Sequence, residues 1–322
     1  MKAIVYHKYG STDVLELKEV EKPTPKDDEV LIKIHAASIN SWDWDLLRGT
    51  PFLVRLGGFL KPKNKILGAD IAGRVEAVGR NVKLLQRGDE VFGDISGGSW
   101  GGFAEYVCVP ENALAHKSFS MTFEQGAAIP QAAVLALQGL RDKGKIEQGQ
   151  KVLINGAGGG VGTFAVQMAK SFGAEVTGVD SERKLELIRS VGADHVIDYT
   201  QEDFTKKGKR YDLILDVVGR RSIYDYKRVL NPKGNYVMIG GLTSRILQIL
   251  FIGPWISMTE GKKMGLLMHK PNKQDLNFIN ELIESGKVVP VIDRRYPLSE
   301  VAEALRYFGE GHIQGKVVIV LE

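Results

Sequence analysis

Apolar residues in the first part of the chain fall into short runs separated by polar positions. Three of these runs, at 29–34, 73–78 and 105–109, carry several Val or Ile residues and have the length of a β-strand. Turn-forming residues lie between them, at Pro23, Pro25 and in the segments 87–89 and 97–98. Few stretches repeat with the 3.6-residue period of a helix. The pattern predicts a small all-β, barrel-like domain over residues 1–122.

A different pattern begins near residue 123 and continues to about residue 268. Continuous apolar runs alternate there with stretches of helical period. The expected strands are 151–154, 175–179, 195–197, 213–218 and 236–239, and the expected helices include 163–172 and 182–191, which end before Gly173 and Gly192. Unbroken apolar strands are typical of parallel sheets that are covered on both faces. This part is therefore predicted to be an α/β domain with a doubly wound parallel sheet.

The last segment, residues 269–322, has the pattern of two helices and a strand. The helices are expected at 276–285 and from Ser299, which would act as an N-cap, and the strand at 316–321. We expect this segment to return to the first domain and to complete its barrel.

The most apolar stretch of the chain lies at 246–256 and is interrupted by Gln248, Gly253 and Pro254. It is too short to cross a bilayer, which takes about 20 residues. We expect it to be buried or to form a lid over an apolar pocket, with a membrane-surface contact as the alternative. No integral membrane association is therefore expected.

A glycine-rich turn at 155–162 follows an apolar strand and opens a helix. Its spacing matches the dinucleotide-binding fingerprint, with Ala157, Gly159 and Gly162 at the three special positions. The backbone N–H groups at the start of the helix can donate to phosphate oxygens. The residues expected to surround the pyrophosphate are Gly158, Gly159, Gly160 and Val161. The turn predicts a nicotinamide dinucleotide cofactor.

The residues that follow the second strand of this domain give two readings of the cofactor. Asp180 stands about 20 residues after the turn, where a carboxylate accepts from the ribose 2′-hydroxyl of NAD. Ser181, Arg183 and Lys184 are the donors that a 2′-phosphate would need. The residues themselves leave the choice between NAD and NADP open.

Charge and cysteine content narrow the class of protein. The formal net charge is +4, and the basic residues are scattered except for a run at 206–210, which is read as a solvated loop. Nucleic-acid binding is therefore not expected. A single cysteine, Cys108, cannot form an internal disulfide or a multi-cysteine zinc site. The chain starts directly with a strand pattern, so a cytoplasmic location is expected.

Several segments together resemble one family. The segments are 66–75, 152–169, 192–199, 212–219, 231–234 and 315–318. They are similar to the zinc-free quinone-reductase branch of the medium-chain dehydrogenase/reductase superfamily, near its zeta-crystallin-like and reticulon-interacting-protein-like members. The resemblance implies a GroES-like β-barrel domain and a Rossmann domain, with the site between them. It also implies hydride transfer from NADPH to a quinone or another small hydrophobic conjugated carbonyl, and a homodimer is expected.

The resemblance also implies roles for single residues. Ser181 and Lys184 match a pair that holds the 2′-phosphate, and Tyr199 matches a tyrosine beside the adenosine. The remaining matches are Val217, Val218 and Gly219 near the ribose, Ile239 and Gly240 near the nicotinamide, and Lys316 near the cleft. These matches favour NADPH, with NAD as the alternative.

Metal and proton chemistry complete the expectations. Zinc-dependent relatives have a cysteine near Asn40 and a histidine-glutamate pair near Asp70, and this chain has neither, so no metal is expected. A conjugated acceptor needs only hydrogen-bond donors for its oxygen, such as the Asn40 amide. Asp43 is a candidate acid or base, or equally an N-cap. Asp70 is expected in a turn that holds the barrel together. The competing hypotheses are a zinc-independent NAD-dependent alcohol or aldehyde dehydrogenase and a low-turnover cofactor-binding regulatory protein.

Overall fold

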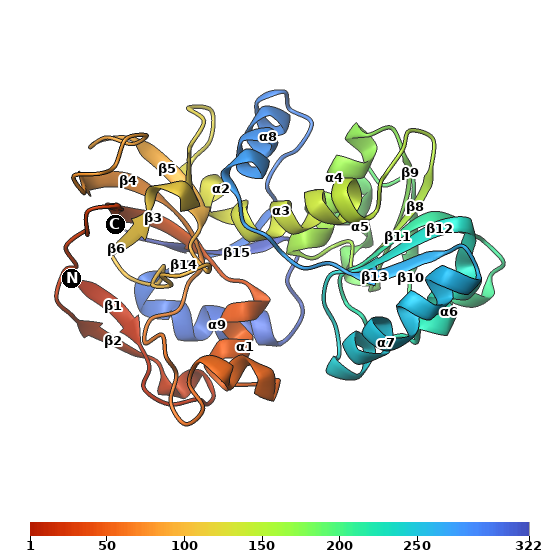
Figure 1. The fold of residues 1–322 in the computed structure, drawn as a ribbon, viewed down its shortest axis with the longest axis horizontal. Coiled ribbons are helices and arrows are strands. Elements are labelled where there is room, and N and C mark those ends of the chain that lie inside the picture. The colour runs from red at the N-terminus through yellow and green to blue at the C-terminus, as the bar shows by residue number, and fades with distance from the viewer. Residues whose placement is uncertain (322) are drawn as a thin grey trace. The chain divides into compact units, whose positions relative to one another are not determined.

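The computed structural model describes residues 1–321. The chain folds into two compact units (Figure 1). Unit 1 comprises Met1–Ala132, Pro271–Glu284 and the chain from Pro290 onward, and unit 2 comprises Ala133–Lys270 and Ser285–Val289. Helix α3 (Pro130–Leu137) contains the point at which the chain passes from unit 1 to unit 2.

Unit 1 is built on a seven-stranded sheet in the order β14-β15-β3-β4-β5-β7, with β6 also paired to β3. Its strands are β3 (Glu29–Ser38), β4 (Asp70–Val78), β5 (Glu90–Asp94), β6 (Tyr106–Pro110), β7 (Leu114–His116), β14 (Ile292–Pro297) and β15 (Lys316–Val320). A separate hairpin contains β1 (Lys2–Val5) and β2 (Glu16–Glu19). Val30, Ile32 and Ile34 alternate along β3 and point into the core, as the period of a strand requires. The last strand, β15, pairs antiparallel with β3, so the end of the chain lies beside its first long strand.

The helices of unit 1 are α1 (Ser41–Arg48), α2 (Phe123–Ala128), α8 (Lys273–Glu284) and α9 (Val301–Gly309). Helix α1 was not predicted, because eight residues with few apolar positions give a weak helical period. The prediction that Ser299 is the N-cap of the last helix was wrong. A 3-10 turn, Leu298–Glu300, precedes α9, and Glu300 stands at the cap position without a side-chain hydrogen bond.

Unit 2 is a six-stranded parallel sheet in the order β10-β9-β8-β11-β12-β13. Its strands are β8 (Lys151–Asn155), β9 (Glu175–Asp180), β10 (His195–Asp198), β11 (Tyr211–Asp216), β12 (Leu230–Met238) and β13 (Lys263–Leu266). Its helices are α4 (Gly160–Ser171), α5 (Leu185–Ser190), α6 (Ile223–Val229) and α7 (Thr243–Thr259). Helix α4 covers one face of the sheet, and α6 and α7 cover the other (Figure 1). The doubly wound parallel sheet is confirmed, and a separate β-sheet unit precedes it along the chain, as the pattern predicts.

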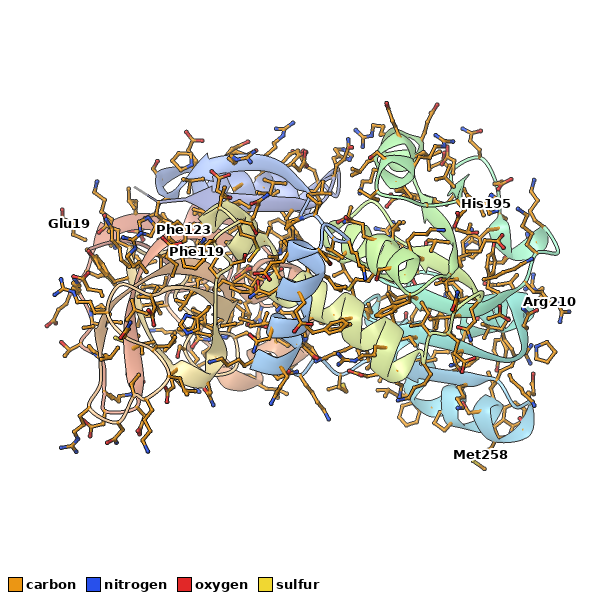
Figure 2. All side chains as sticks on the ribbon, turned by 90° about the horizontal axis from the view of Figure 1, so that it is seen from above. Glu19, Phe119, Phe123, His195, Arg210 and Met258 are labelled. Atoms are coloured by element: carbon orange, nitrogen blue, oxygen red, sulfur yellow. The ribbon has the colours of Figure 1, made fainter. Side chains whose placement is uncertain are left out.

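The apolar segment 246–256 lies in α7, and only one side of this helix is buried. Ile249 and Ile256 face the core of unit 2, whereas Phe251, Trp255 and Met258 are exposed. Figure 2 shows Met258 pointing away from the body of unit 2. The expectation of a buried segment was therefore wrong for this face, because apolar residues occur on both sides of the helix and their period is hidden. Within residues 1–321, no helix is long and apolar enough to cross a membrane.

Candidate functional site

The glycine-rich turn connects β8 to α4, as the fingerprint predicts. Gly159 is the N-cap of α4, and the first N–H groups of the helix, including those of Gly160 and Val161, have no partner within the helix. At Gly162 an added Cβ would lie 2.1 Å from the carbonyl oxygen of Gly156, so only glycine lets the helix pack this closely. At Gly159 an added Cβ would meet only one atom within 4 Å, at 3.6 Å. The space in front of α4 is therefore open, and its free N–H groups fit a dinucleotide pyrophosphate.

The end of β9 is tied to this turn through Asp180. The buried Asp180 carboxylate accepts from the backbone N–H of Gly158 at 3.0 Å and from that of Ser181 at 2.9 Å. The Lys184 ammonium lies 3.7 Å from the same carboxylate, and the Tyr199 N–H donates to the Asp180 carbonyl at 3.2 Å. The structure therefore brings these predicted residues together, and it gives Asp180 backbone partners that sequence reasoning did not foresee.

The predicted ribose and nicotinamide residues lie together at the carboxyl ends of β11 and β12. The N–H of Val217 donates to the Asn155 carbonyl at 3.0 Å, which places the end of β11 beside the glycine-rich turn. Gly219 packs so closely against the backbone of Gly240 that an added Cβ would lie 2.4 Å from the Gly240 carbonyl oxygen. Ile239 follows β12 directly, and Val218 lies against Gly156. Their roles toward a cofactor stay predictions.

Asp216 organises this edge of the sheet and was missed from the sequence. It is fully buried, and its carboxylate accepts from the Gly219 N–H at 2.9 Å, the Asn155 amide at 2.8 Å and the Tyr236 hydroxyl at 2.8 Å. Burial, together with the Asp216 charge, raises the pKa of Tyr236. The available signal was a single carboxylate at the end of the apolar run 213–216, where a buried charge needs several donors.

A second cluster of predicted residues lies in unit 1, where β15, β4 and the start of α1 meet. The buried Lys316 ammonium donates to the Asn40 side-chain oxygen at 2.5 Å and to the Ile39 carbonyl at 3.1 Å, and it lies 3.5 Å from the Asp70 carboxylate. Asp70 is the first residue of β4 rather than part of a turn. The structure thus places Lys316 with Asn40 in unit 1, whereas the other residues predicted to bind the cofactor belong to unit 2.

Burial sets the charges of this cluster. It raises the pKa of Asp70 to about 6, and the Lys316 charge opposes that rise. Burial also lowers the pKa of Lys316, while Asp70 favours its charged form. The Nδ2 atom of Asn40 is buried and has no hydrogen-bond partner at ordinary distance among the described residues, and the Asn40 side chain lowers the pKa of Asp70, as an NH₂ group turned toward that carboxylate does. A buried donor without an acceptor is costly, by about 1–3 kcal/mol, so this NH₂ group needs an acceptor.

Asp43 lies next to this cluster but has a structural set of contacts. Its carboxylate is fully buried and accepts from the backbone N–H of Asn40 at 2.8 Å and from that of Gly68 at 2.9 Å. It thereby caps the start of α1 and ties this helix to the segment before β4. Burial raises its pKa to about 7 despite these hydrogen bonds. A direct catalytic role for Asp43 stays a prediction.

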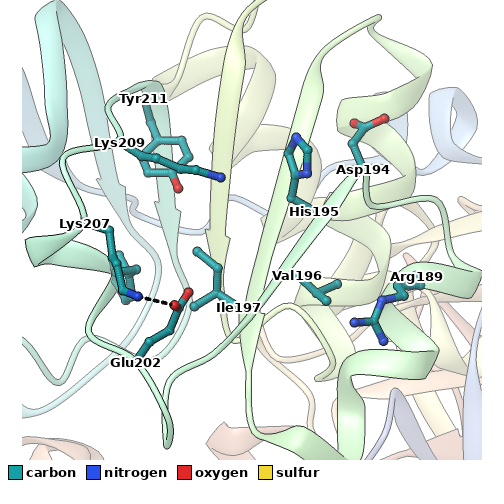
Figure 3. Close-up of a pocket in the computed structure, with 10 residues that line it drawn as sticks. Arg189, Asp194, His195, Val196, Ile197, Glu202, Lys207, Lys209 and Tyr211 are labelled. Carbon is teal, nitrogen blue, oxygen red and sulfur yellow. Dashed lines mark ion pairs between the residues drawn. The ribbon is translucent and has the colours of Figure 1, made fainter.

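A hollow of about 530 Å³ in unit 2 contains none of the predicted site residues (Figure 3). Figure 3 shows Tyr211 and Lys209 on one side of it and His195 on the other, with an ion pair of 2.9 Å between Lys207 and Glu202. It lies along β10 and the segment before β11. It is not part of the candidate site.

Two family models match most of the chain. The Alcohol dehydrogenase GroES-like domain matches residues 26–118, and the Zinc-binding dehydrogenase model matches residues 191–319. A third model, the Alanine dehydrogenase/PNT C-terminal domain, matches residues 138–220 and so includes the glycine-rich turn.

The zinc ion that the second model's description implies does not fit the residues of unit 1. The resemblance puts the zinc ligands of zinc-dependent relatives near Asn40 and near Asp70, and in this structure the Lys316 ammonium contacts both of these residues. A lysine ammonium has no lone pair to give a metal, and its positive charge repels a dication. Among residues 1–321, no group of three or more His, Cys, Asp or Glu side chains could hold a metal ion.

Whole-chain relatives agree with the family models. A 2-methylene-furan-3-one reductase of Solanum lycopersicum is 38% identical over 99% of this chain and 79% of its own length. An NADPH-dependent alkenal/one oxidoreductase of Arabidopsis thaliana is 35% identical over 99% of this chain and 79% of its own length. The solved quinone oxidoreductase of Coxiella burnetii has a TM-score of 0.90 and 29% identity, with 100% of this chain and 99% of that chain covered. The chain therefore belongs to the medium-chain dehydrogenase/reductase superfamily, in its branch of NAD(P)H-dependent quinone and alkenal/one oxidoreductases.

Proposed function

We propose that this protein reduces small hydrophobic conjugated carbonyl compounds, enones or quinones, with NADPH as the hydride donor. The observation that carries the proposal is the buried Asn40 amide of unit 1, whose Nδ2 has no partner among the described residues. A substrate carbonyl oxygen is the acceptor that such a donor lacks. The relatives named as reductases of a furanone, of alkenals and enones, and of quinones support the same class of acceptor.

The cofactor proposal rests on unit 2. The open space in front of α4 would take the pyrophosphate, with Gly158, Gly159, Gly160 and Val161 around it. Ser181, Lys184 and Tyr199 lie beside Asp180 at the end of β9, where the adenosine ribose of a bound dinucleotide belongs. The Lys184 ammonium lies 3.7 Å from the Asp180 carboxylate, so a positive charge stands where the 2′-phosphate of NADPH would bind. This favours NADPH over NADH.

The chemistry needs little from the protein beyond position and charge. When bound, the reduced nicotinamide supplies a hydride to the acceptor, whose double-bond electron pair moves onto its carbonyl oxygen. The chain's task is to hold that oxygen and to stabilise its negative charge, which the Asn40 N–H would do by donating a hydrogen bond. A proton from water then completes the reduced product, so no buried acid is required.

We also propose a homodimer that forms through unit 2. Strand β13 is an edge strand that pairs only with β12 among the described strands, and Phe251, Trp255 and Met258 of the adjacent helix α7 are exposed. An open strand edge beside an apolar helix face is a surface that a second copy can cover. Phe251→Glu should shift the mass measured by light scattering to that of one chain, and an unchanged mass would remove this surface from the proposal.

The cytoplasmic location stays a prediction, since the relatives include proteins named as chloroplastic and mitochondrial.

Stopped-flow oxidation of bound NADPH by a panel of acceptors tests the proposed function. We expect fast oxidation by enones and quinones and none by saturated ketones or aldehydes. NAD reduction by simple alcohols would instead indicate a dehydrogenase. Tight cofactor binding without oxidation by any acceptor would indicate a cofactor-binding regulatory protein.

A further inference from the structure

The ammonium group of Lys316 makes all of its recorded contacts with residues of unit 1. Its side chain is almost fully buried, and its three N–H bonds face the Asn40 oxygen, the Ile39 carbonyl and the Asp70 carboxylate. The Asp70 carboxylate is held in turn by the Gln131 N–H at 3.1 Å. A lysine with three such partners has no proton left for a cofactor phosphate or a substrate, so its influence must pass through one of them.

Two donors act on the Asn40 amide oxygen, the Lys316 ammonium and, in the capping box of α1, the backbone N–H of Asp43. An ammonium group can only donate, so the amide must present its oxygen to Lys316 and turn its NH₂ group away. The backbone of Asn40 is fixed as well, because its N–H donates to the buried Asp43 carboxylate at 2.8 Å. Both ends of Asn40 are therefore held, while its Nδ2 remains without an acceptor among residues 1–321.

The same contact strengthens the free donor. A positive charge bound to the amide oxygen draws electron density from the nitrogen, and each bond in such a chain polarises the next. If the Asn40 NH₂ group holds a substrate oxygen, only the Asn40 amide separates the ammonium from the negative charge that develops there, and both residues are buried, where charges interact strongly. Burial lowers the pKa of Lys316, and the neighbouring Asp70 charge favours its protonated form.

We propose that Lys316 is a positioning residue for the reduction, which clamps the Asn40 oxygen so that the Asn40 NH₂ group faces the acceptor's carbonyl oxygen. This inference rests on the proposed function. It assigns to a fixed lysine charge, acting through an amide, the polarising role that a metal ion performs as a Lewis acid. It also differs from the sequence-based expectation that Lys316 contacts the cofactor.

A double-mutant cycle tests the proposal, with Lys316→Met and Asn40→Ala alone and combined. Each single variant should lower kcat for an enone, Asn40→Ala by about 100-fold and Lys316→Met by about tenfold or more, in the range for loss of an oxyanion donor. In the Asn40→Ala background, Lys316→Met should lower kcat no further, because the lysine acts through that amide. The Kd for NADPH should not change. An equal loss in both backgrounds, or a raised Kd for NADPH, would overturn the proposal.

Lys117→Met is the matched control. Lys117 is another buried lysine of unit 1, bonded to the Met121 carbonyl at 2.7 Å and to Glu90 at 2.9 Å, far along the chain from the cluster. The Lys117→Met variant should have a lower free energy of unfolding than wild type and an unchanged kcat. Lys316→Met leaves the buried Asp70 charge uncompensated. If this single variant does not fold, the double variant Lys316→Met/Asp70→Asn, which removes both charges, takes its place in the cycle.

A readout independent of turnover separates failure of the inference from failure of the proposed function. If the wild-type protein reduces no acceptor, the proposed function fails, and crystal structures of wild type and Lys316→Met then decide the positioning claim. The Asn40 side chain should keep one rotamer in wild type and leave it in the variant. An unchanged Asn40 rotamer would contradict the clamp.

Discussion

The carboxylate of Asp180 accepts a hydrogen bond from the backbone N–H of Gly158 at 3.0 Å. This bond joins the residue expected to read the ribose to the turn expected to hold the pyrophosphate. Asp180 therefore has a structural task in addition to any contact with the cofactor. A change at this position should alter both the affinity for the dinucleotide and the choice between its two forms.

Asp180→Ala should weaken the binding of both NADPH and NADH, because the Gly158 N–H loses its acceptor. It should also raise the ratio of NADPH affinity to NADH affinity, since the negative charge that repels a 2′-phosphate is gone. Titration calorimetry with both cofactors measures the two effects. A ratio equal to that of wild type would exclude Asp180 as the discriminating residue.

Lys184→Met should raise the Kd for NADPH about tenfold and leave the Kd for NADH nearly unchanged, as expected for loss of one charge-assisted hydrogen bond of about 1.4 kcal/mol. Arg189→Met is the control, because Arg189 is an exposed basic residue of the adjoining helix α5. It should change neither Kd. If both variants raise the Kd for NADPH equally, the loss of affinity comes from the general positive charge of the surface and not from a contact made by Lys184.

Substitutions at two glycines of the turn should affect different properties, cofactor affinity in one case and stability in the other. Gly159→Asp should abolish cofactor binding with little loss of stability, because its side chain enters open space in front of α4. Gly162→Ala should destabilise the fold by about 1–3 kcal/mol, since its Cβ would lie 2.1 Å from the Gly156 carbonyl oxygen. Urea unfolding and calorimetry on each variant test the pair. Unchanged affinity in Gly159→Asp would mean that the turn is assigned to the wrong ligand.

Asp43 should make stability depend on pH. Its pKa is raised from 3.8 to about 7 by burial, so between these values the folded protein binds a proton that the unfolded chain lacks. The free energy of unfolding should therefore fall as pH rises from about 4 to about 7, and stay lower above that range. The pKa of Asp70 is raised to about 6 and acts in the same direction, while the Lys316 charge opposes both shifts. Asp43→Asn should flatten the dependence measured by urea unfolding at pH 5 and pH 8.

The same variant decides whether Asp43 takes part in the chemistry. Both of its oxygens accept backbone N–H groups and its side chain is fully buried, so Asp43→Asn should keep kcat within about tenfold of wild type. A loss of about 100-fold or more in a folded variant would show instead that Asp43 transfers a proton.

The sequence predicted five of the six strands of unit 2, because most of them are apolar runs and the glycine-rich turn marks where one helix begins. It missed β13, which is only four residues long and begins with a lysine. Both predicted C-caps, Gly173 and Gly192, have the positive φ that the pattern indicated. Helix α1 was missed because tertiary contacts specify it. Asp43 caps it from within, and Gly68, which follows 25 residues later, supplies the second donor.

The sequence predicted single residues of the candidate site but not the hydrogen bonds that connect them. Asn40, Asp70 and Lys316 lie far apart in the sequence, and no local pattern shows that β15 brings the lysine to the amide. Asp216 was missed for a similar reason, since two of its donors, Asn155 and Tyr236, come from other strands. Buried polar networks depend on strand order, which periodicity alone does not specify.

Transfer of deuterium from the cofactor tests the central claim most directly. NADPH that carries deuterium on the transferred face of its nicotinamide is incubated with the protein and an enone, and the product is analysed by mass spectrometry and NMR. The account predicts one deuterium at the β-carbon of a saturated ketone, with an oxidised cofactor formed for each product. A product without deuterium, or no product while a simple alcohol is oxidised, would contradict it.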